Sequence, residues 1–258
     1  MEIDQLYDQA LIHMEHTVNL LAENVPPPQK IQYIDSFVFR HTEKTLHQAL
    51  VQKLARLVSN LNATRLLMEH GFVQEQAALQ RILDELNEDI TFLAYGVIFD
   101  NLTPLHSNYL GEFFKEEFNT DSAIDSEQKR GMIPRKKIRA YIASIIEEFA
   151  DLDQSNGLEA MRTISKTYSG YIHAASPQIM TMYGGNPPKF YVRGMLGTLR
   201  HDEHRADLWN YFYRSIIAFA LSAKAFGAND LYTDITAFVD KFANISAKDY
   251  QSKEWENI

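Results

Sequence analysis

Hydrophobic residues recur with the spacing of an α-helix along almost the whole chain, and strict alternation over the length of a strand is hard to find. This pattern predicts an all-α fold, a single-domain helical bundle of about eight or nine helices. The helices are expected at about residues 4–23, 29–70 with a break near His41, 72–100, 104–118, 134–150, 156–174, 199–226 and 229–243.

Prolines, glycines and polar runs mark the boundaries of these helices. Three consecutive prolines, Pro26 to Pro28, end the first helix, and Gly71 is expected to be a left-handed cap at the end of the second. We treat residues 1–258 as one domain. It contains an exposed linker loop at 119–131, a glycine- and proline-rich loop region at 175–198 and a polar tail at 246–258.

The helix expected at 72–100 carries a polar pair that is a candidate for chemistry. Arg81 and Glu85 are four residues apart, so they are neighbours on one helix face, and further along that face lie Phe92 and Phe99. A face with aromatic residues at one end is expected to be covered by other elements. The alternative is an ordinary ion pair on a surface helix. The core stripe of this helix is predicted to be Phe72, Leu79, Ile82, Leu83, Leu86, Ile90, Leu93 and Val97.

A second candidate follows the helix expected at 156–174 into the loop after it. Arg162, Lys166, Ser169 and His173 form one stripe on this helix, opposite an apolar arc that includes Tyr168. Such a stripe suits a phosphate, and a histidine moves protons near neutral pH. Tyr183 and Arg193, in the loop region, are predicted to line the same ligand site. The alternative is a solvated basic face with an exposed histidine.

Composition narrows the chemistry that the chain can perform. The absence of cysteine excludes disulfides and thiolate ligands, and no cofactor is predicted. The net charge of −9 disfavours broad binding to nucleic acid, but a local basic site could hold RNA or a nucleotide. The first residues are acidic, unlike a secretory signal, and no apolar run spans a membrane, so we expect a cytoplasmic protein. The local basic site would consist of Lys129, Arg130, Arg135, Lys136, Lys137 and Arg139.

A third candidate lies at the start of the helix expected at 199–226. His201 and His204 share one face, and two histidines at this spacing can share a metal ion. The pair His201-Asp202 resembles the metal-binding pair of helical HD phosphohydrolases, although charged Arg200 and Glu203 replace the small apolar neighbours usual there. The alternative is a pair of histidines with structural hydrogen bonds, and we assign no metal ligand. Phosphate-binding loops, dinucleotide fingerprints and nucleophile elbows are absent.

Several of these motifs together resemble a known class of helical proteins. The segment Leu66 to Glu75, then Arg81 and Glu85, then Tyr168 to His173, resembles a large uncharacterised family of bacterial all-helical proteins over roughly residues 45–180. That family is similar to the HEPN superfamily, several members of which are metal-independent RNases of toxin–antitoxin and phage-defence systems. HEPN RNases carry an arginine a few residues before a histidine on one helix, whereas here Arg162 stands eleven positions before His173.

The resemblance implies a shared polar site made by Arg81, Glu85 and His173, assisted by Tyr168 or Ser169. In an RNase, His173 would be the general acid or base, Arg81 would hold the phosphate, and Glu85 would orient Arg81. Two alternatives stay open: a non-catalytic module for protein interaction or regulation, and a metal-dependent phosphohydrolase centred on His201 and Asp202. A homodimer is a further expectation of the HEPN-like interpretation.

Overall fold

The computed structural model describes residues 3–33, 36–118, 120, 124–150, 163, 166 and 168–245. Within them the chain is mostly helical, with two small two-stranded sheets, so the predicted all-α bundle is confirmed. The helices are α1 (Ile3–Ala22), α2 (Leu46–Glu69), α3 (Val73–Ile98), α4 (Pro104–Phe113), α5 (Arg135–Ala150), α7 (Ser169–Ile172), α8 (Ser176–Met180), α9 (Leu199–Ala225) and α10 (Asn229–Ile245). The strands are β1 (Gln29–Tyr33), β2 (Ser36–Arg40), β3 (Tyr183–Gly184) and β4 (Lys189–Phe190).

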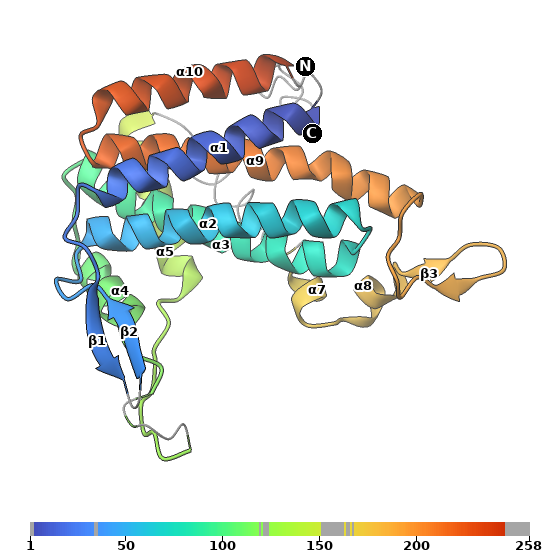
Figure 1. The fold of residues 1–258 in the computed structure, drawn as a ribbon, viewed down its shortest axis with the longest axis horizontal. Coiled ribbons are helices and arrows are strands. Elements are labelled where there is room, and N and C mark those ends of the chain that lie inside the picture. Colours follow the sequence, from blue (N-terminus) through green and yellow to red (C-terminus); the bar gives the residue numbers. More distant parts are fainter. Residues whose placement is uncertain are drawn as a thin grey trace.

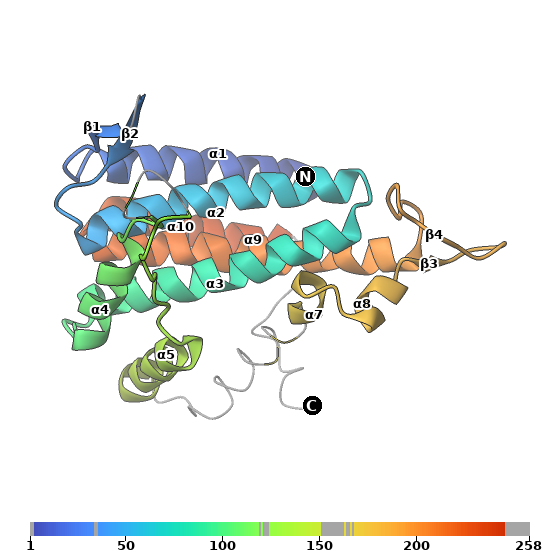
Figure 2. The same ribbon diagram turned by 90° about the horizontal axis from the view of Figure 1, so that it is seen from below.

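The long helices α1, α2, α3, α9 and α10 lie alongside one another and enclose the core (Figure 1). Helix α3 is the central element, because it packs against α2, α9 and α5, and Figure 2 shows α5 on the side of α3 away from α1 and α2. The fully buried side chains include Leu50 and Leu54 of α2, Phe92 of α3 and Phe212 of α9. None of the described helices combines the length and apolar character needed to cross a bilayer.

The turn between α2 and α3 confirms the predicted glycine cap. Gly71 has φ +73°, which a residue with a side chain rarely adopts. A Cβ atom there would also lie 2.7 Å from the backbone nitrogen of Leu196, so the close packing of this turn against residues 195–196 needs glycine. The Met195 amide donates to the Gly71 carbonyl at 2.7 Å, which ties the start of α9 to the α2–α3 turn.

The helix predicted at 29–70 is wrong over its first part, where the chain forms the antiparallel hairpin β1–β2. Its register runs from Gln29 opposite Arg40 to Tyr33 opposite Ser36. The residues responsible are β-branched and aromatic, and they favour strands. Helix α2 begins only at Leu46, after Thr45, whose hydroxyl accepts from the Gln48 amide at 3.2 Å. The strand-forming residues are Ile31, Tyr33, Phe37, Val38 and Phe39.

The region 175–198 is not only loop, because it contains α8 and the short hairpin β3–β4, with Tyr183 opposite Phe190. Of the helix predicted at 156–174, most residues, including Arg162, lie outside the described ones, as does the predicted tail at 246–258. Helix α4 ends at Phe113 rather than Phe118. The two hairpins project from opposite ends of the bundle (Figures 1 and 2).

Candidate functional site

Arg81 and Glu85 form the predicted pair on α3. The guanidinium Nη2 of Arg81 lies 2.7 Å from a carboxylate oxygen of Glu85, and the Arg81 side chain is 13% exposed against 43% for Glu85. Phe92, further along this helix, is completely buried. The predicted covering of this face is therefore observed at Arg81 and Phe92, while Glu85 faces an opening.

His173 lies elsewhere. It ends the short helix α7 and is exposed, and within the described part of the chain no hydrogen bond or ion pair connects it with Arg81 or Glu85. Tyr183 and Arg193, at and beside the projecting hairpin β3–β4, are also exposed. The structure thus joins two members of the predicted catalytic group and puts the third on the surface. Ser169 begins α7, and Lys166 is exposed.

The histidine enclosed by polar groups at this end is His204 of α9, not His173. Its Nδ1 lies 3.1 Å from the Gln76 side-chain oxygen and its Nε2 lies 3.4 Å from the Tyr171 hydroxyl. Burial lowers the pKa of His204 to about 4, so the ring is neutral at pH 7. Tyr168 is close by and donates its hydroxyl to Asp207, and burial raises its pKa. These contacts connect α9 with Gln76 of α3 and with Tyr171 of α7.

His201, the other histidine of the predicted metal pair, is likewise occupied by structural contacts. Its Nε2 lies 2.9 Å from the Met68 carbonyl and its Nδ1 lies 3.8 Å from Asp202. Over the residues that the structure describes, no cluster of three or more histidine or carboxylate side chains could hold a metal ion. The metal-dependent alternative gains no ligand set from this geometry.

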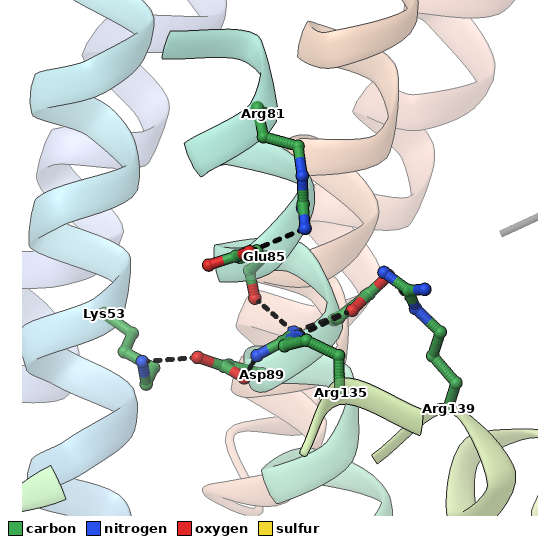
Figure 3. Close-up of polar contacts among 7 residues, drawn as sticks. Lys53, Arg81, Glu85, Asp89, Arg135 and Arg139 are labelled. Atoms are coloured by element: carbon green, nitrogen blue, oxygen red, sulfur yellow. Dashed lines mark hydrogen bonds and ion pairs between the residues drawn. The ribbon is translucent and has the colours of Figure 1, made fainter. Parts of the chain in front are cut away.

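The most concentrated charged cluster of the described residues lies where α2, α3 and α5 meet (Figure 3). Asp89 accepts from Lys53 Nζ at 2.7 Å and from Arg135 at 2.5 Å. Arg135 also bonds Glu88 at 2.7 Å, and Glu88 binds Arg139 at 2.8 Å. Four of these side chains are about nine-tenths buried, and Arg135 is four-fifths buried. The Arg135 guanidinium further donates to the Glu85 carbonyl at 3.0 Å, which links the cluster to the Arg81–Glu85 pair.

Ion pairing outweighs the effect of burial on the pKa values of Asp89 and Arg135. Burial alone would raise the pKa of Asp89, but Lys53 and Arg135 outweigh burial and hold that pKa below its ordinary value. Burial would likewise lower the pKa of Arg135, and Asp89 and Glu88 raise it instead. The pKa of Tyr109 is raised by burial and by Asp89. Asp89 and Arg135 are therefore both held in the charged form, and each needs its partners because an unpaired buried charge is costly.

Beside this cluster lies a chamber of about 400 Å³, which opens between α4 and the segment 130–133. Lys53, Asp89 and Arg135 are on its wall, and Tyr109 and Phe113 of α4 provide aromatic surface. The Lys53 ammonium lies 4.8 Å from the Phe113 ring centroid. Three cations against four carboxylates give the chamber lining a net charge of −1. The cations are Lys53, Arg130 and Arg135, and the carboxylates are Glu85, Asp89, Glu112 and Glu117.

A larger groove of about 800 Å³ adjoins the chamber, between hairpin β1–β2 and the end of α4. The two hollows share Phe113, Glu117 and Arg130. Four cations against two carboxylates give the groove a net charge of +2, in a chain whose net charge is −9. The cations are Arg40, Lys44, Lys115 and Arg130, and the carboxylates are Glu116 and Glu117.

The groove cations differ in how tightly they are held. Arg40 grips Glu116 through two bonds of 2.5 and 2.9 Å, and Arg130 lies 3.3 Å from Glu117. No ion pair joins Lys44 to a carboxylate among the described residues, and Lys44 is exposed. Lys44 therefore adds a positive charge to the groove that no ion pair offsets among the described residues.

Exposed aromatic and apolar side chains accompany this charge. Phe39, on the groove wall, is 59% exposed, and Phe37 and Tyr33 on the same hairpin are 45% and 43% exposed. Lys30 lies 3.7 Å above the Phe37 ring. A two-stranded hairpin is marginal alone in water, and a group of exposed aromatic rings on such a hairpin is typical of an interaction surface. Such a surface is suited to a partner that carries both negative charge and flat apolar faces.

The predicted basic site at residues 129–139 is divided by the fold. Arg135 and Arg139 turn inward and are paired with carboxylates, while Arg130 reaches the boundary of groove and chamber. Lys136 and Lys137 are exposed on α5. Neither groove nor chamber is lined by His173, Tyr183 or Arg193.

No family model matches the chain, and searches of curated proteins and of solved structures find no match either.

Proposed function

We propose that this protein binds single-stranded nucleic acid in the groove between hairpin β1–β2 and α4. The observation that carries the proposal is the combination in one groove of net positive charge and exposed aromatic surface, on a chain that is acidic overall. We therefore place the local basic site for nucleic acid in this groove rather than along the basic run at residues 129–139. We also propose the HEPN-like relationship, which rests on the resemblance of motifs in the sequence.

The chemistry of a single strand fits both features. Phosphates are attracted by Lys44, Lys115 and Arg130, and unstacked bases can lie on rings such as Phe39. Stacking on an aromatic side chain contributes about 1–3 kcal/mol per base. The net negative chamber behind the groove is less suited to phosphate, so the strand is proposed to follow the groove.

The test is a titration of fluorescein-labelled single-stranded RNA, and of DNA of the same sequence, followed by polarisation in excess EDTA. The double variant Lys44→Glu/Lys115→Glu is compared with Lys136→Glu/Lys137→Glu, which makes the same charge change on exposed positions outside the groove. We expect the groove variant to bind at least about tenfold more weakly, about 1.4 kcal/mol. The affinity should fall as salt is raised. Equal losses in the two variants, or no binding by the wild type, would reject the groove.

A second candidate function, metal-independent RNA cleavage, is favoured by one observation in this groove. His41 is on its lining, and its Nδ1 lies 3.1 Å from the Pro26 carbonyl oxygen. A hydrogen bond donated by Nδ1 leaves Nε2 as a lone-pair acceptor, which is the form needed to take the proton of an RNA 2′-hydroxyl. The hydroxyl oxygen would then attack the phosphorus and expel the 5′-oxygen, which takes a proton from water.

The same RNA samples separate the two candidates. Intact RNA after binding in EDTA supports a binding module, whereas cleavage to 2′,3′-cyclic phosphate ends that His41→Ala abolishes supports the nuclease. Cleavage that persists in His41→Ala and disappears in His173→Ala would instead restore the site first predicted from the sequence.

A further inference from the structure

A third hollow, apart from the chamber and the groove, lies on a different side of α3 and is lined by two residues that carry buried polar atoms without partners. It has a volume of about 190 Å³, in the wedge between α3, α5 and α9. At about 100° per residue, its α3 residues Asp84 and Asn87 lie more than a quarter turn from Glu85 and Asp89 of the chamber. The hollow is therefore separate from the chamber, and it shares no lining residue with the groove. Its lining is Asp84, Asn87, Glu88, Thr91, Ile142, Arg214, Ile217 and Ala218.

The unpartnered atoms belong to Asp84 and Asn87. Asn87 is 8% exposed, and neither its amide oxygen nor its amide nitrogen has a hydrogen-bond partner. Asp84 is 2% exposed; Arg214 bonds its Oδ1 at 2.7 Å, while its Oδ2 has no partner. Leaving such groups unpaired inside a protein is unfavourable, so each calls for an explanation.

The other members of the hollow restrict what can fill it. Glu88 is fully engaged by Arg135 and Arg139, so it offers little to a ligand. Ile142, Ile217 and Ala218 provide apolar walls. The volume is below the roughly 300–1,000 Å³ of pockets for drug-sized ligands, which suggests a single small ring system.

We propose that this hollow binds a heterocyclic base with an amino group next to a ring nitrogen, as in adenine. Asp84 and Asn87 are three residues apart on one helix face and are therefore neighbours. The two hydrogens of one amino group match the Asp84 Oδ2 and Asn87 Oδ1 acceptors, and the ring nitrogen accepts from Asn87 Nδ2. Rotation about the last side-chain bond, which is loosely restrained in asparagine, turns the amide toward the hollow.

This assignment also explains why Asn87 is tolerated in a helix interface. A buried amide without partners lowers the stability of the ligand-free protein, and a ligand that pairs with it recovers the loss. Leucine has nearly the shape of asparagine and no polar atoms. Asn87→Leu is therefore expected to abolish binding and to raise the melting temperature of the ligand-free protein.

The experiment is calorimetric titration of the full chain with adenine and with hypoxanthine, which carries an oxygen in place of the amino group. We expect adenine to bind at least tenfold more tightly than hypoxanthine. Asn87→Leu should remove the adenine signal, and Thr91→Phe, which fills the hollow from a half-buried position, should do the same. A parallel titration with adenosine shows whether the hollow also accepts the base when it carries a ribose.

The control is Asn60→Leu, because Asn60 is 2% exposed and its amide nitrogen also lacks a partner, but it does not line the hollow. This variant should bind adenine as the wild type does. Equal binding of adenine and hypoxanthine, no binding of either, or full adenine binding by both Asn87→Leu and Thr91→Phe would overturn the assignment. The groove variant Lys44→Glu/Lys115→Glu should bind adenine normally. A negative result for nucleic-acid binding in the groove can therefore be distinguished from a negative result for adenine binding in the hollow.

Discussion

The two ends of the bundle each carry a projecting hairpin, but they differ in what surrounds it. At the β1–β2 end, cationic and aromatic side chains line a groove of about 800 Å³ that adjoins a chamber with a buried ion cluster. At the β3–β4 end, His173 is exposed, and the enclosed histidine, His204, is held by structural hydrogen bonds. In the sequence, the glycines and prolines of residues 175–198 point to the β3–β4 end. The candidate binding surface lies instead at the β1–β2 end.

The ion cluster at the β1–β2 end should contribute most to the stability of the fold. Asp89→Ala leaves Lys53 and Arg135 with one carboxylate fewer in a buried setting, and should lower the free energy of unfolding by about 3–5 kcal/mol. Glu85→Ala, which removes a 43% exposed carboxylate, should cost less than about 1 kcal/mol. Urea unfolding of both variants measures the difference. Similar losses would mean that the cluster is not what holds α5 to α3.

At the other end, the expected signature is a dependence of stability on pH. The folded pKa of His204 is about 4 and its unfolded pKa is about 6.5, so the neutral ring is favoured by folding. Its contribution is complete above about pH 6.5 and is lost as the pH falls toward 4, by about 3 kcal/mol in total. Urea unfolding across this range should show the loss in the wild type, and His204→Gln should flatten it. An unchanged slope in the variant would contradict the assignment.

Aromatic residues at the two ends provide a matched comparison for binding. Phe39, 59% exposed on the groove, and Phe190, 46% exposed on β4, are both hairpin phenylalanines. If Phe39 stacks on a base, Phe39→Ala should weaken binding by about 1–3 kcal/mol. Phe190→Ala should leave the affinity for single-stranded RNA unchanged, as measured by polarisation. A larger loss in the β4 variant would move the binding surface to the other end.

The smallest effect is expected at His173. Because it is exposed and no hydrogen bond or ion pair joins it to Arg81 or Glu85 among the described residues, His173→Ala should change RNA affinity less than about twofold, roughly 0.4 kcal/mol. It should also leave any cleavage in EDTA as in the wild type. Loss of cleavage in this variant alone would revive the HEPN-like catalytic hypothesis at its original position.

The sequence predicted the helices well because their signals are local. Apolar spacing located the five long helices, and the glycine at position 71 marked the end of α2. The aromatic end of the α3 face also indicated correctly that Arg81 is covered. The hairpin β1–β2 was missed because a helical interpretation was extended through a run of β-branched and aromatic residues that favour strands.

The candidate site was harder to predict because its members are far apart in the chain. Lys53 and Arg135 bond Asp89 although they are 36 and 46 positions away from it in the sequence. No local spacing predicts such contacts. The groove likewise combines the hairpin with α4 and with Arg130. The basic run at 129–139 was visible in the sequence, but only the fold decides that Arg135 and Arg139 point inward.

The most direct test of nucleic-acid binding in the groove is to map where single-stranded RNA lies on the wild-type protein, by ultraviolet cross-linking and mass spectrometry of the attached peptides. Both ends offer exposed aromatic residues, so either can report. We expect cross-links in the β1–β2 hairpin and the end of α4, at Phe37, Phe39 or Phe114, and their loss in Lys44→Glu/Lys115→Glu. Cross-links confined to Tyr183, Phe190 or Tyr191 would contradict binding at the groove.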